Sequence, residues 1–339
     1  MRASSYPKLY KEFSGRVVKA DNRFKHVMSL ALHPYDRQKG LVRCILSRVG
    51  NIRIKGYIDR SELHLIKGNF PYHYVVGERL KINGEEEMIK ELERKNWESI
   101  GLEDPDIWYD PDDQRLHIYF TIPLRAKRKG GRMRIYLGHA EGNSLNSLRI
   151  TEPVLTNDRF SAKEVAIAPK NTQDFRYNLF ESSDKVGKTR FSTIRVAIAK
   201  QASPPWEFGK TVFHPAKQGF DWCAGHASPG PLLPKTFIDL GKGKCLGIIN
   251  GREANKQVGE KTFYGVFSVG LMIYNYERGE IEWVSPRPFI RDPQAKTITF
   301  ASQFVETAPG QGVLYAHIDD SFVRAYCINA NSLKLLLPN

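Results

Sequence analysis

Short runs of β-branched and aromatic residues, separated by clusters of glycine, asparagine, aspartate and proline, dominate this chain and indicate strands and turns. Pairs of such apolar runs recur along the sequence. The first runs of the pairs cover residues 43–48, 116–121, 177–181, 244–250 and 312–317, and the second runs cover 52–58, 134–139, 194–199, 265–274 and 322–328. Five such units at spacings of roughly 40 to 70 residues predict an all-β fold, a five-bladed β-propeller.

We expect a single domain over residues 1–339, with blades at 27–80, 100–155, 160–215, 220–290 and 295–337. A pair of β-sandwiches is the alternative, but it would show more even strand spacing and no recurrence of this kind. Residues 85–95 are the best helical segment, because Met88, Ile89 and Leu92 share one face and charged residues fill the rest. We expect a short helical insertion there, between strands.

The net charge of +14 raises the question of nucleic-acid binding. The densest basic run covers residues 124–134, between strand-like segments at 116–122 and 134–138, so it also predicts a glycine-tipped hairpin loop. No helix-turn-helix, zinc finger or aromatic RNA-binding signature accompanies it. We therefore rank a nucleic-acid-binding scaffold behind the sugar-related functions considered below and do not expect nucleic acid as a partner.

The chain carries no pattern of a metal site, a disulfide framework or a leader segment. The four cysteines (Cys44, Cys223, Cys245 and Cys327) are far apart, which predicts buried free thiols. The nine histidines include no His-x-His or His-Glu-x-x-His arrangement, so we expect no metal and no cofactor. The N-terminus lacks an apolar signal core and no apolar run reaches roughly 18 residues, which favours a cytoplasmic protein with no membrane partner. The oligomeric state stays open.

Two adjacent carboxylates precede a proline in the run 97–106, where Glu103 and Asp104 are followed by Pro105. Neighbouring strand residues face opposite sides, so both carboxylates cannot enter one sheet core. One of them is expected at a rigid strand entrance, because proline removes a backbone donor there. Such a carboxylate is suited to general acid catalysis. The alternative is a solvated acidic loop, since Asp-Pro is also an ordinary turn signal.

A propeller would bring distant blade entrances together at one central funnel. Carboxylates and cations in such a funnel are what sugar chemistry uses, because one acid protonates the leaving oxygen and fixed donors bind hydroxyls. Their opposed charges also push pKa values apart. The residues expected to meet are His33, Arg48, Glu103, Asp104, Lys163, Glu164, His226, Ser228 and Asp320.

Four segments in the same order resemble glycoside hydrolase family 130, the β-mannoside phosphorylases and mannosidases built on a five-bladed propeller. Residues 98–105 resemble the family's Gly-x-Glu-Asp-Pro-Arg signature, and residues 163–170 are similar to its Lys-Asp block. Residues 228–232, followed by 247–251, resemble the fourth blade's entrance and next strand. Residues 313–321 are similar to the Tyr-Tyr-Gly-Ala-Ala-Asp block. The similarity extends from about residue 30 to the C-terminus.

The resemblance implies individual roles. Asp104 would be the general acid, acting through a sugar hydroxyl, and Arg48 would contact the sugar. Lys163 and Asp320 would hold ring hydroxyls in the −1 subsite. Apart from the resemblance, the funnel argument makes Glu103 and His226 further expected substrate contacts. Each position has a structural alternative: Arg48 could pair with a carboxylate, Lys163 could cap a loop, and Asp320 could be a hairpin-turn residue.

The chain departs from the family pattern at several cations. Asp106 stands where the signature has its final arginine, Phe180-Glu181 replaces a His-Arg pair, and Asn250-Gly251-Arg252 replaces a His-Gly pair. A phosphorylase needs fixed cations around its phosphate. The candidates to replace the missing ones are Arg125, Arg128, Arg252 and His226.

The leading hypothesis is an enzyme that cleaves a β-linked glycoside, with a β-mannoside as candidate, by inverting hydrolysis. Glu164 is then the expected base, with Glu181 second. One alternative is an inverting phosphorylase that takes inorganic phosphate as co-substrate. The other is a non-catalytic propeller that binds an oligosaccharide without turnover. In every case the expected partner is an oligosaccharide or glycoside.

Overall fold

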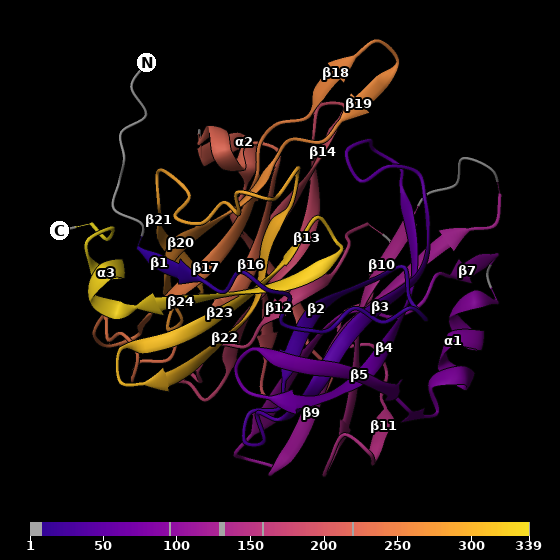
Figure 1. Cartoon of the computed structure of the whole chain (residues 1–339), viewed down its shortest axis with the longest axis horizontal. Coiled ribbons are helices and arrows are strands. Elements are labelled where there is room, and N and C mark those ends of the chain that lie inside the picture. Colours follow the sequence, from indigo (N-terminus) through magenta and orange to yellow (C-terminus); the bar gives the residue numbers. More distant parts are fainter. Residues whose placement is uncertain (1–8, 95, 129–132, 158, 219, 339) are drawn as a thin grey trace.

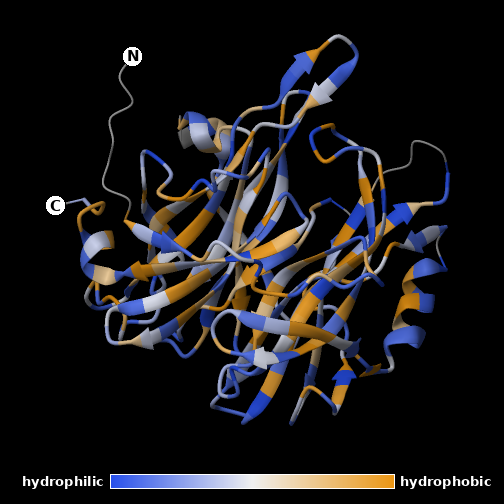
Figure 2. Ribbon diagram, in the orientation of Figure 1, coloured by the Kyte–Doolittle hydropathy of each residue, from blue (hydrophilic) through white to orange (hydrophobic). Residues whose placement is uncertain are grey.

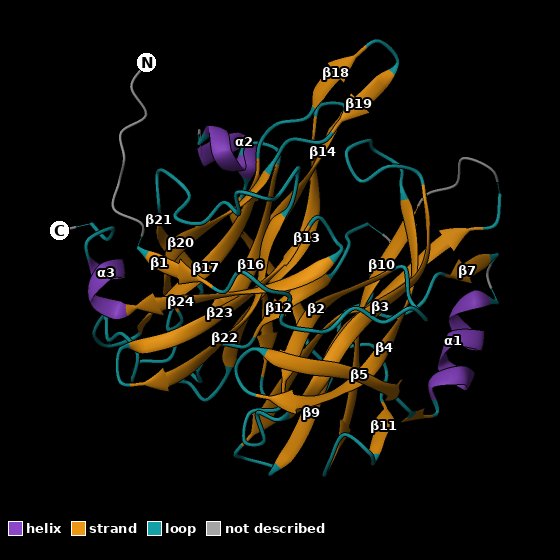
Figure 3. Ribbon diagram, in the orientation of Figure 1, coloured by secondary structure: helices purple, strands orange, loops and turns teal. Residues whose placement is uncertain are grey.

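The computed structural model describes residues 9–94, 96–128, 133–157, 159–218 and 220–338, and strands make up most of them (Figure 3). The prediction of a mostly-β chain is confirmed. The helices are short: α1 Glu85–Glu93, α2 Pro215–Gln218 and α3 Ala330–Lys334, with one 3-10 turn at Asp221–Cys223. In the described part of the chain, no helix is long and apolar enough to cross a bilayer.

Five groups of antiparallel strands follow one another along the chain (Figure 1). The first is β2 His26–Leu32, β3 Lys39–Val49, β4 Ile58–Asn69 and β5 His73–Arg79. The second is β8 Glu103–Asp110, β9 Arg115–Ala126, β10 Met133–Gly142 and β11 Leu148–Ile150, with β7 Trp97–Ser99 on β9 and β6 Ile82–Asn83 on β11. The third is β12 Lys163–Ala166, β13 Arg176–Val186, β14 Thr189–Ala199 and β15 Glu207–Phe213.

The last two groups contain the chain's remaining strands. The fourth is β16 His226–Leu232, β17 Lys244–Arg252, β20 Phe267–Asn275 and β21 Glu280–Val284, with a separate hairpin of β18 Lys256–Val258 and β19 Lys261–Phe263. The fifth is β22 Thr299–Ala308, β23 Gln311–Ile318 and β24 Phe322–Asn329, and its outer strand is the N-terminal β1 Tyr10–Glu12. A single bridge between Ser192 and His226 also joins β14 to β16.

The groups pack on one another through their apolar faces. In β9 every residue from Leu116 to Leu124 is buried, including His117 and Thr121, so both faces of this strand are covered. Figure 2 shows hydrophobic residues along the strands and hydrophilic ones on α1's outer side and in the loops. Met88, Ile89 and Leu92 of α1 pack on the same core cluster, which confirms the expected helix and its apolar face.

The first strands of several groups are interrupted by bulges. The strand register shifts between Met28 and Leu30, between Glu103 and Asp106, and between Lys163 and Val165. The residues inside these shifts include Ser29, Asp104 and Glu164, with φ of 53°, 47° and 49°. Residues other than glycine rarely adopt this left-handed backbone conformation, and a bulge changes the direction in which its side chain points. The bulges therefore fix where the carboxylates of residues 104 and 164 point.

The structure also tests the expectations for the basic run and for the cysteines. Residues 124–134 do form a β9–β10 hairpin, with Arg125 opposite Met133; the tip at 129–132 lies outside the described residues. All four cysteines are free thiols, and Cys44, Cys223 and Cys245 are buried as expected, whereas Cys327 is half-buried.

Candidate active site

A cavity of about 1000 Å³ opens at one end of the strand groups. Six carboxylates line it: Asp59, Glu103, Asp104, Glu164, Glu181 and Asp320. Lys163 and His226 line it too, so the fold gathers six of the seven residues predicted from sequence to bind or act on substrate. These residues come from β8, β12, β16 and the turn after β23, which are far apart in the sequence.

Arg43 of β3 organises the floor of this cavity. Its Nη2 donates to Glu103 Oε1 at 2.5 Å and its Nη1 donates to Asp104 Oδ1 at 3.1 Å. Its Nε donates to Ser61 Oγ at 3.1 Å, and that hydroxyl donates to the Leu102 carbonyl at 3.2 Å. Burial alone would lower the pKa of Arg43, but the two carboxylates outweigh it and raise it. Arg43 is therefore a permanent cation with every branch of its guanidinium bound.

The carboxyls of Asp104 and Glu164 lie within hydrogen-bonding reach of each other. Burial would raise the pKa of Asp104, but Arg43, His317 and Lys163 outweigh it and the pKa is lowered. The pKa of Glu164 is raised well above its ordinary value, by burial first and by the charge of Asp104 second. These shifts favour the ionised form of Asp104 and the protonated form of Glu164 in the resting cavity, whereas the sequence-based hypothesis makes Asp104 the acid and Glu164 the base; those roles stay predictions.

Glu103 is the third carboxyl of this cluster. Burial and the neighbouring Asp104 raise its pKa to about 7, although Arg43 acts in the opposite direction. Proton sharing in such a group follows from like charges brought together in a dry site. The cluster can therefore supply a proton near neutral pH without a histidine.

Glu181 forms a second, permanently charged centre on the cavity wall. Its carboxylate lies 3.5 Å from Lys163 Nζ and 3.0 Å from His226 Nε2. Burial would raise its pKa, but His226 and Lys163 outweigh burial and lower it to about 2. Lys163 in turn keeps a raised pKa because Glu181 and Glu164 outweigh its burial. The pair presents a fixed ammonium group to whatever enters the cavity.

The carboxylate of Asp320 has two partners, and the residue lies in the tight turn between β23 and β24, where its φ is 45°. Tyr57 donates to its Oδ2 at 2.7 Å, and His317 Nε2 lies 3.3 Å from its Oδ1. Burial would raise its pKa, but the hydrogen bond and charge of His317 outweigh burial and lower it. This ionised carboxylate can accept hydrogen bonds from sugar hydroxyls.

Arg48 is the one predicted site residue that does not line the cavity. It binds both oxygens of Asp59, at 2.7 and 2.8 Å, and its Nη2 donates to the Asp320 carbonyl at 2.9 Å. Arg48 therefore pairs with a carboxylate, which is the structural alternative given for it above. His33 and Ser228, also expected at the funnel, do not line the cavity. Asp106 stays off the lining too, and burial raises its pKa to about 6.

Several lining residues were not singled out from the sequence as site residues. Arg43 binds Asp104 from 61 residues away in the chain. Tyr57 and His317 contact Asp320, from 263 and 3 residues away respectively. Only His317 carried a local signal, since it lies within the segment 313–321 that resembles the family block.

Arg252 lies on the cavity wall with part of its guanidinium buried and unpartnered in the described residues. It lies over the Tyr264 ring, 4.4 Å from its centroid, and over Phe267 at 5.3 Å. Burial lowers its pKa, and its Nε has no hydrogen-bond partner in the described residues. A buried donor of this kind favours an anionic ligand that would satisfy it.

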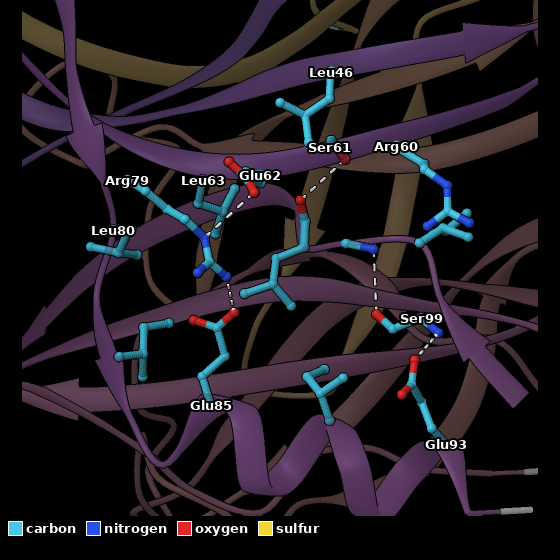
Figure 4. A pocket seen from close by; sticks show the side chains of 15 residues that line it. Leu46, Arg60, Ser61, Glu62, Leu63, Arg79, Leu80, Glu85, Glu93 and Ser99 are labelled. Atoms are coloured by element: carbon cyan, nitrogen blue, oxygen red, sulfur yellow. Dashed lines mark hydrogen bonds and ion pairs between the residues drawn. The ribbon is translucent and has the colours of Figure 1, made fainter.

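A second cavity of about 310 Å³ lies behind the first, against α1 (Figure 4). Figure 4 shows Arg79 between Glu62 and Glu85, where it donates to Glu85 Oε1 at 2.6 Å. Ile100 lines both cavities, and Ser61, which lines this one, binds Arg43 of the larger cavity. Arg79 pairs with both Glu62 and Glu85. Arg60 pairs with Glu98, outside the lining, and Glu93 accepts a hydrogen bond from the Ser99 N–H.

Three residues elsewhere place ligand-type atoms within 4.8 Å of one another: His117, His139 and Glu141. Each already has a partner in the protein. His117 Nε2 lies 3.0 Å from Asp113, His139 Nδ1 lies 2.8 Å from Thr151, and Glu141 accepts from Arg115 at 2.8 Å. Internal hydrogen bonds account for this cluster.

Solved structures resemble this fold, whereas no protein-family model and no curated protein matches the sequence. A putative glycoside hydrolase from Parabacteroides distasonis matches with a TM-score of 0.64 and 16% identity, covering 94% of this chain and 96% of that chain. The β-1,2-mannobiose phosphorylase of Listeria innocua, in complex with β-1,2-mannobiose, matches with 0.63 and 9%, covering 98% and 95%. A mannose phosphorylase from Leishmania mexicana, in complex with phosphate ion, matches with 0.55 and 14%, covering 95% and 88%.

At these identities the similarity establishes the fold. The resemblance to glycoside hydrolase family 130 is confirmed as a distant structural similarity that extends over nearly the whole chain. The activities in those names belong to the compared proteins.

Proposed function

We propose that this protein is an enzyme that cleaves a β-linked glycoside with inversion, on a five-bladed propeller whose blades are the five strand groups. The observation that supports it best is a cluster of three carboxyls in a cavity large enough for sugar rings: Glu103 and Asp104 bind Arg43, and Glu164 contacts Asp104. A β-mannoside is the first substrate to test, because two of the similar structures are named as mannobiose and mannose phosphorylases.

The cluster offers one proton for the departing oxygen. Asp104 is the proposed donor, and Arg43 fixes its orientation. In the resting cavity the proton rests on Glu164, so a substrate that inserts a hydroxyl between the two carboxyls must carry the proton across to Asp104. Glu164 is then ionised and becomes the proposed base for water. Such rearrangement on binding is ordinary for catalytic hydrogen bonds.

Phosphorolysis is the second candidate, and two observations favour it. Asp104 and Glu164 are in close contact, whereas the carboxyls of inverting hydrolases stand roughly 6.5–9.5 Å apart to hold a water between them. Arg252 and His226 line the same cavity and would supply cations for a phosphate nucleophile, which needs no protein base.

The test is incubation with a panel of β-linked oligosaccharides, with and without inorganic phosphate, and identification of the products. Free sugar formed without phosphate makes the protein a hydrolase, and a sugar 1-phosphate formed only with phosphate makes it a phosphorylase. Inversion predicts that the first-formed product has the α configuration by proton NMR. Binding without product under both conditions would contradict the proposal and leave a carbohydrate-binding protein.

A further inference from the structure

The charges of the large cavity are separated by depth. Every carboxylate that lines it is buried or half-buried. The exposed charged residues that line it are all cations in the described part of the chain. They are Lys55, Lys127, Arg128 and Arg190. The cavity therefore has an acidic floor and a basic mouth.

The cations at the mouth are unpaired, unlike those at the floor. Within the described residues, none of the four forms an ion pair, and Arg190 donates only to the Ser183 hydroxyl, at 2.7 Å. Arg43 and Lys163 at the floor, in contrast, both pair with carboxylates. Like charges around one opening repel each other and add to a positive potential that concave walls focus. An anion at the mouth would relieve that repulsion.

The mouth is also bounded by backbone on one side. The loop before β4 joins the β18–β19 hairpin through Lys55 N to the Thr262 carbonyl, 3.0 Å, and Tyr264 N to the Arg53 carbonyl, 2.9 Å. Figure 1 shows the β18–β19 hairpin projecting at the top of the molecule. Lys55 precedes β4, Lys127 and Arg128 follow β9, and Arg190 opens β14, so the basic side chains belong to the first, second and third groups.

We propose that the substrate is a glycoside whose aglycone, the part that leaves, carries an anionic group such as a phosphate, a sulfate or a carboxylate. This inference rests on the proposed function. A sugar ring on the floor uses hydroxyl contacts with carboxylates, and the rest of the molecule must pass the four cations to leave the cavity. A neutral aglycone gains nothing from them, whereas an anionic aglycone forms charge-assisted hydrogen bonds.

The test compares β-mannosyl disaccharides whose reducing-end sugar is glucose, glucuronate, glucose 6-phosphate or glucose 6-sulfate. Dissociation constants are measured by calorimetry on the Asp104→Asn protein, which is not expected to consume them. We expect at least one anionic disaccharide to bind about 10-fold tighter than the neutral one at low salt, and this preference to shrink in 0.5 M NaCl, where the screening length falls to a few ångströms. The best of the three identifies the anionic group.

Charge-reversing substitutions at the cavity mouth test whether these cations cause the preference for an anionic disaccharide. Introducing Arg128→Glu and Arg190→Glu together should remove the preference and change binding of the neutral disaccharide by less than about twofold, since exposed pairs contribute little individually. The matched control carries Lys256→Glu and Lys261→Glu on the exposed β18–β19 hairpin, outside the cavity lining, with the same change in net charge. It should keep the preference.

Two outcomes would overturn the inference: equal binding of neutral and anionic disaccharides, or an equal loss of preference in the control. Turnover of the neutral disaccharide by the unmodified protein decides the proposed function separately. If that turnover is found without anionic preference, only the inference is wrong.

Discussion

At the scale of single residues, Arg43 decides which carboxyl of the site carries a proton. Its guanidinium binds Glu103 and Asp104, so the ionised form of Asp104 is favoured and the contacting Glu164 becomes the acid form. Three buried carboxyls close to one cation are stable together only when at least one of them stays protonated. The site therefore stores a transferable proton close to an ionised carboxylate.

Asp104→Asn should lower kcat/KM for glycosides with poor leaving groups by roughly 10²- to 10⁴-fold, the usual contribution of a general acid. Aryl glycosides with good leaving groups should lose least, because their departing oxygen needs no proton. Steady-state kinetics over a series of leaving groups measures both effects. Near-normal activity on unactivated glycosides would remove Asp104 from the acid role.

The Glu164→Gln substitution distinguishes water from phosphate as the nucleophile. It should abolish hydrolysis, because no base then activates water. Phosphorolysis needs no protein base, since phosphate is itself the nucleophile, so it should be slowed by the loss of the proton that Glu164 holds for Asp104 but not abolished. The matched control is Glu207→Gln, which neutralises an exposed carboxylate on β15 away from the cavity. Full hydrolytic activity in the Glu164 variant would exclude that residue as the base.

Glu181 gives the site a stability signature in acid. The pKa of Glu181 is about 2 in the folded protein, against a reference value of 4.5. Its ionised carboxylate therefore stabilises the folded protein fully above pH 4.5, and this stabilisation is lost as the pH falls towards 2. The shift corresponds to about 3 kcal/mol in the free energy of unfolding. Glu181→Gln should therefore be less stable at pH 7 and lose less on acidification, as measured by urea unfolding between pH 7 and 3. Parallel pH profiles would contradict this.

At the scale of elements, the approach to β8 holds the acid in place. Gly101 has φ +117° and forms a bridge with Ser61, so a Cβ there would lie 1.9 Å from the Ser61 carbonyl oxygen. Ser61 is also the hydroxyl partner of Arg43. Strand position, arginine orientation and carboxylate placement are therefore coupled through one close backbone contact.

Gly101→Ala should destabilise the protein by at least about 2 kcal/mol more than Gly56→Ala. The control glycine has a similar φ of +101° but nothing within 4 Å of its Cβ position, so the difference isolates the steric contact from the backbone preference. Chemical denaturation of both variants measures it. Equal losses would show that the bridge can relax without cost.

Elements with a regular pattern were predictable from the sequence, and contacts between distant segments were not. The apolar face of α1 and the β-branched runs predicted their elements, because periodicity is a local property. The left-handed backbone at Asp104 and Glu164 has no such signal, and neither do the partners of Arg43, which lie about 60 residues away. The carboxylates were identified from their motif, whereas their protonation depends on neighbours that only the fold supplies.

At the scale of the whole molecule, the two ends of the chain meet in one sheet. β1 pairs with β24, where Tyr10 faces Ile328 and its ring packs edge-on against Tyr326 at 5.3 Å. A three-residue strand carries too little pattern to be predicted, so the sequence did not reveal this pairing. It covers an edge of β24 that would otherwise present unpaired backbone groups.

Deleting residues through Glu12 should lower the free energy of unfolding by about 2 kcal/mol or more and promote association through the exposed edge of β24. Thermal unfolding and light scattering measure the two effects. Lys11→Ala is the control, because it alters an exposed side chain and keeps the strand pairing. A truncated protein as stable as the full chain would show that β1 contributes nothing to the sheet.

The central claim is that glycoside cleavage takes place at the carboxylates on the floor of the large cavity. A crystal structure of the Asp104→Asn protein with a β-mannosyl disaccharide tests it most directly. We predict that the glycosidic oxygen lies within hydrogen-bonding reach of residue 104, directly or through one sugar hydroxyl, with Lys163 and Asp320 on the same ring. A disaccharide seated in the cavity beside α1, or on the outer surface with the floor empty, would contradict the account.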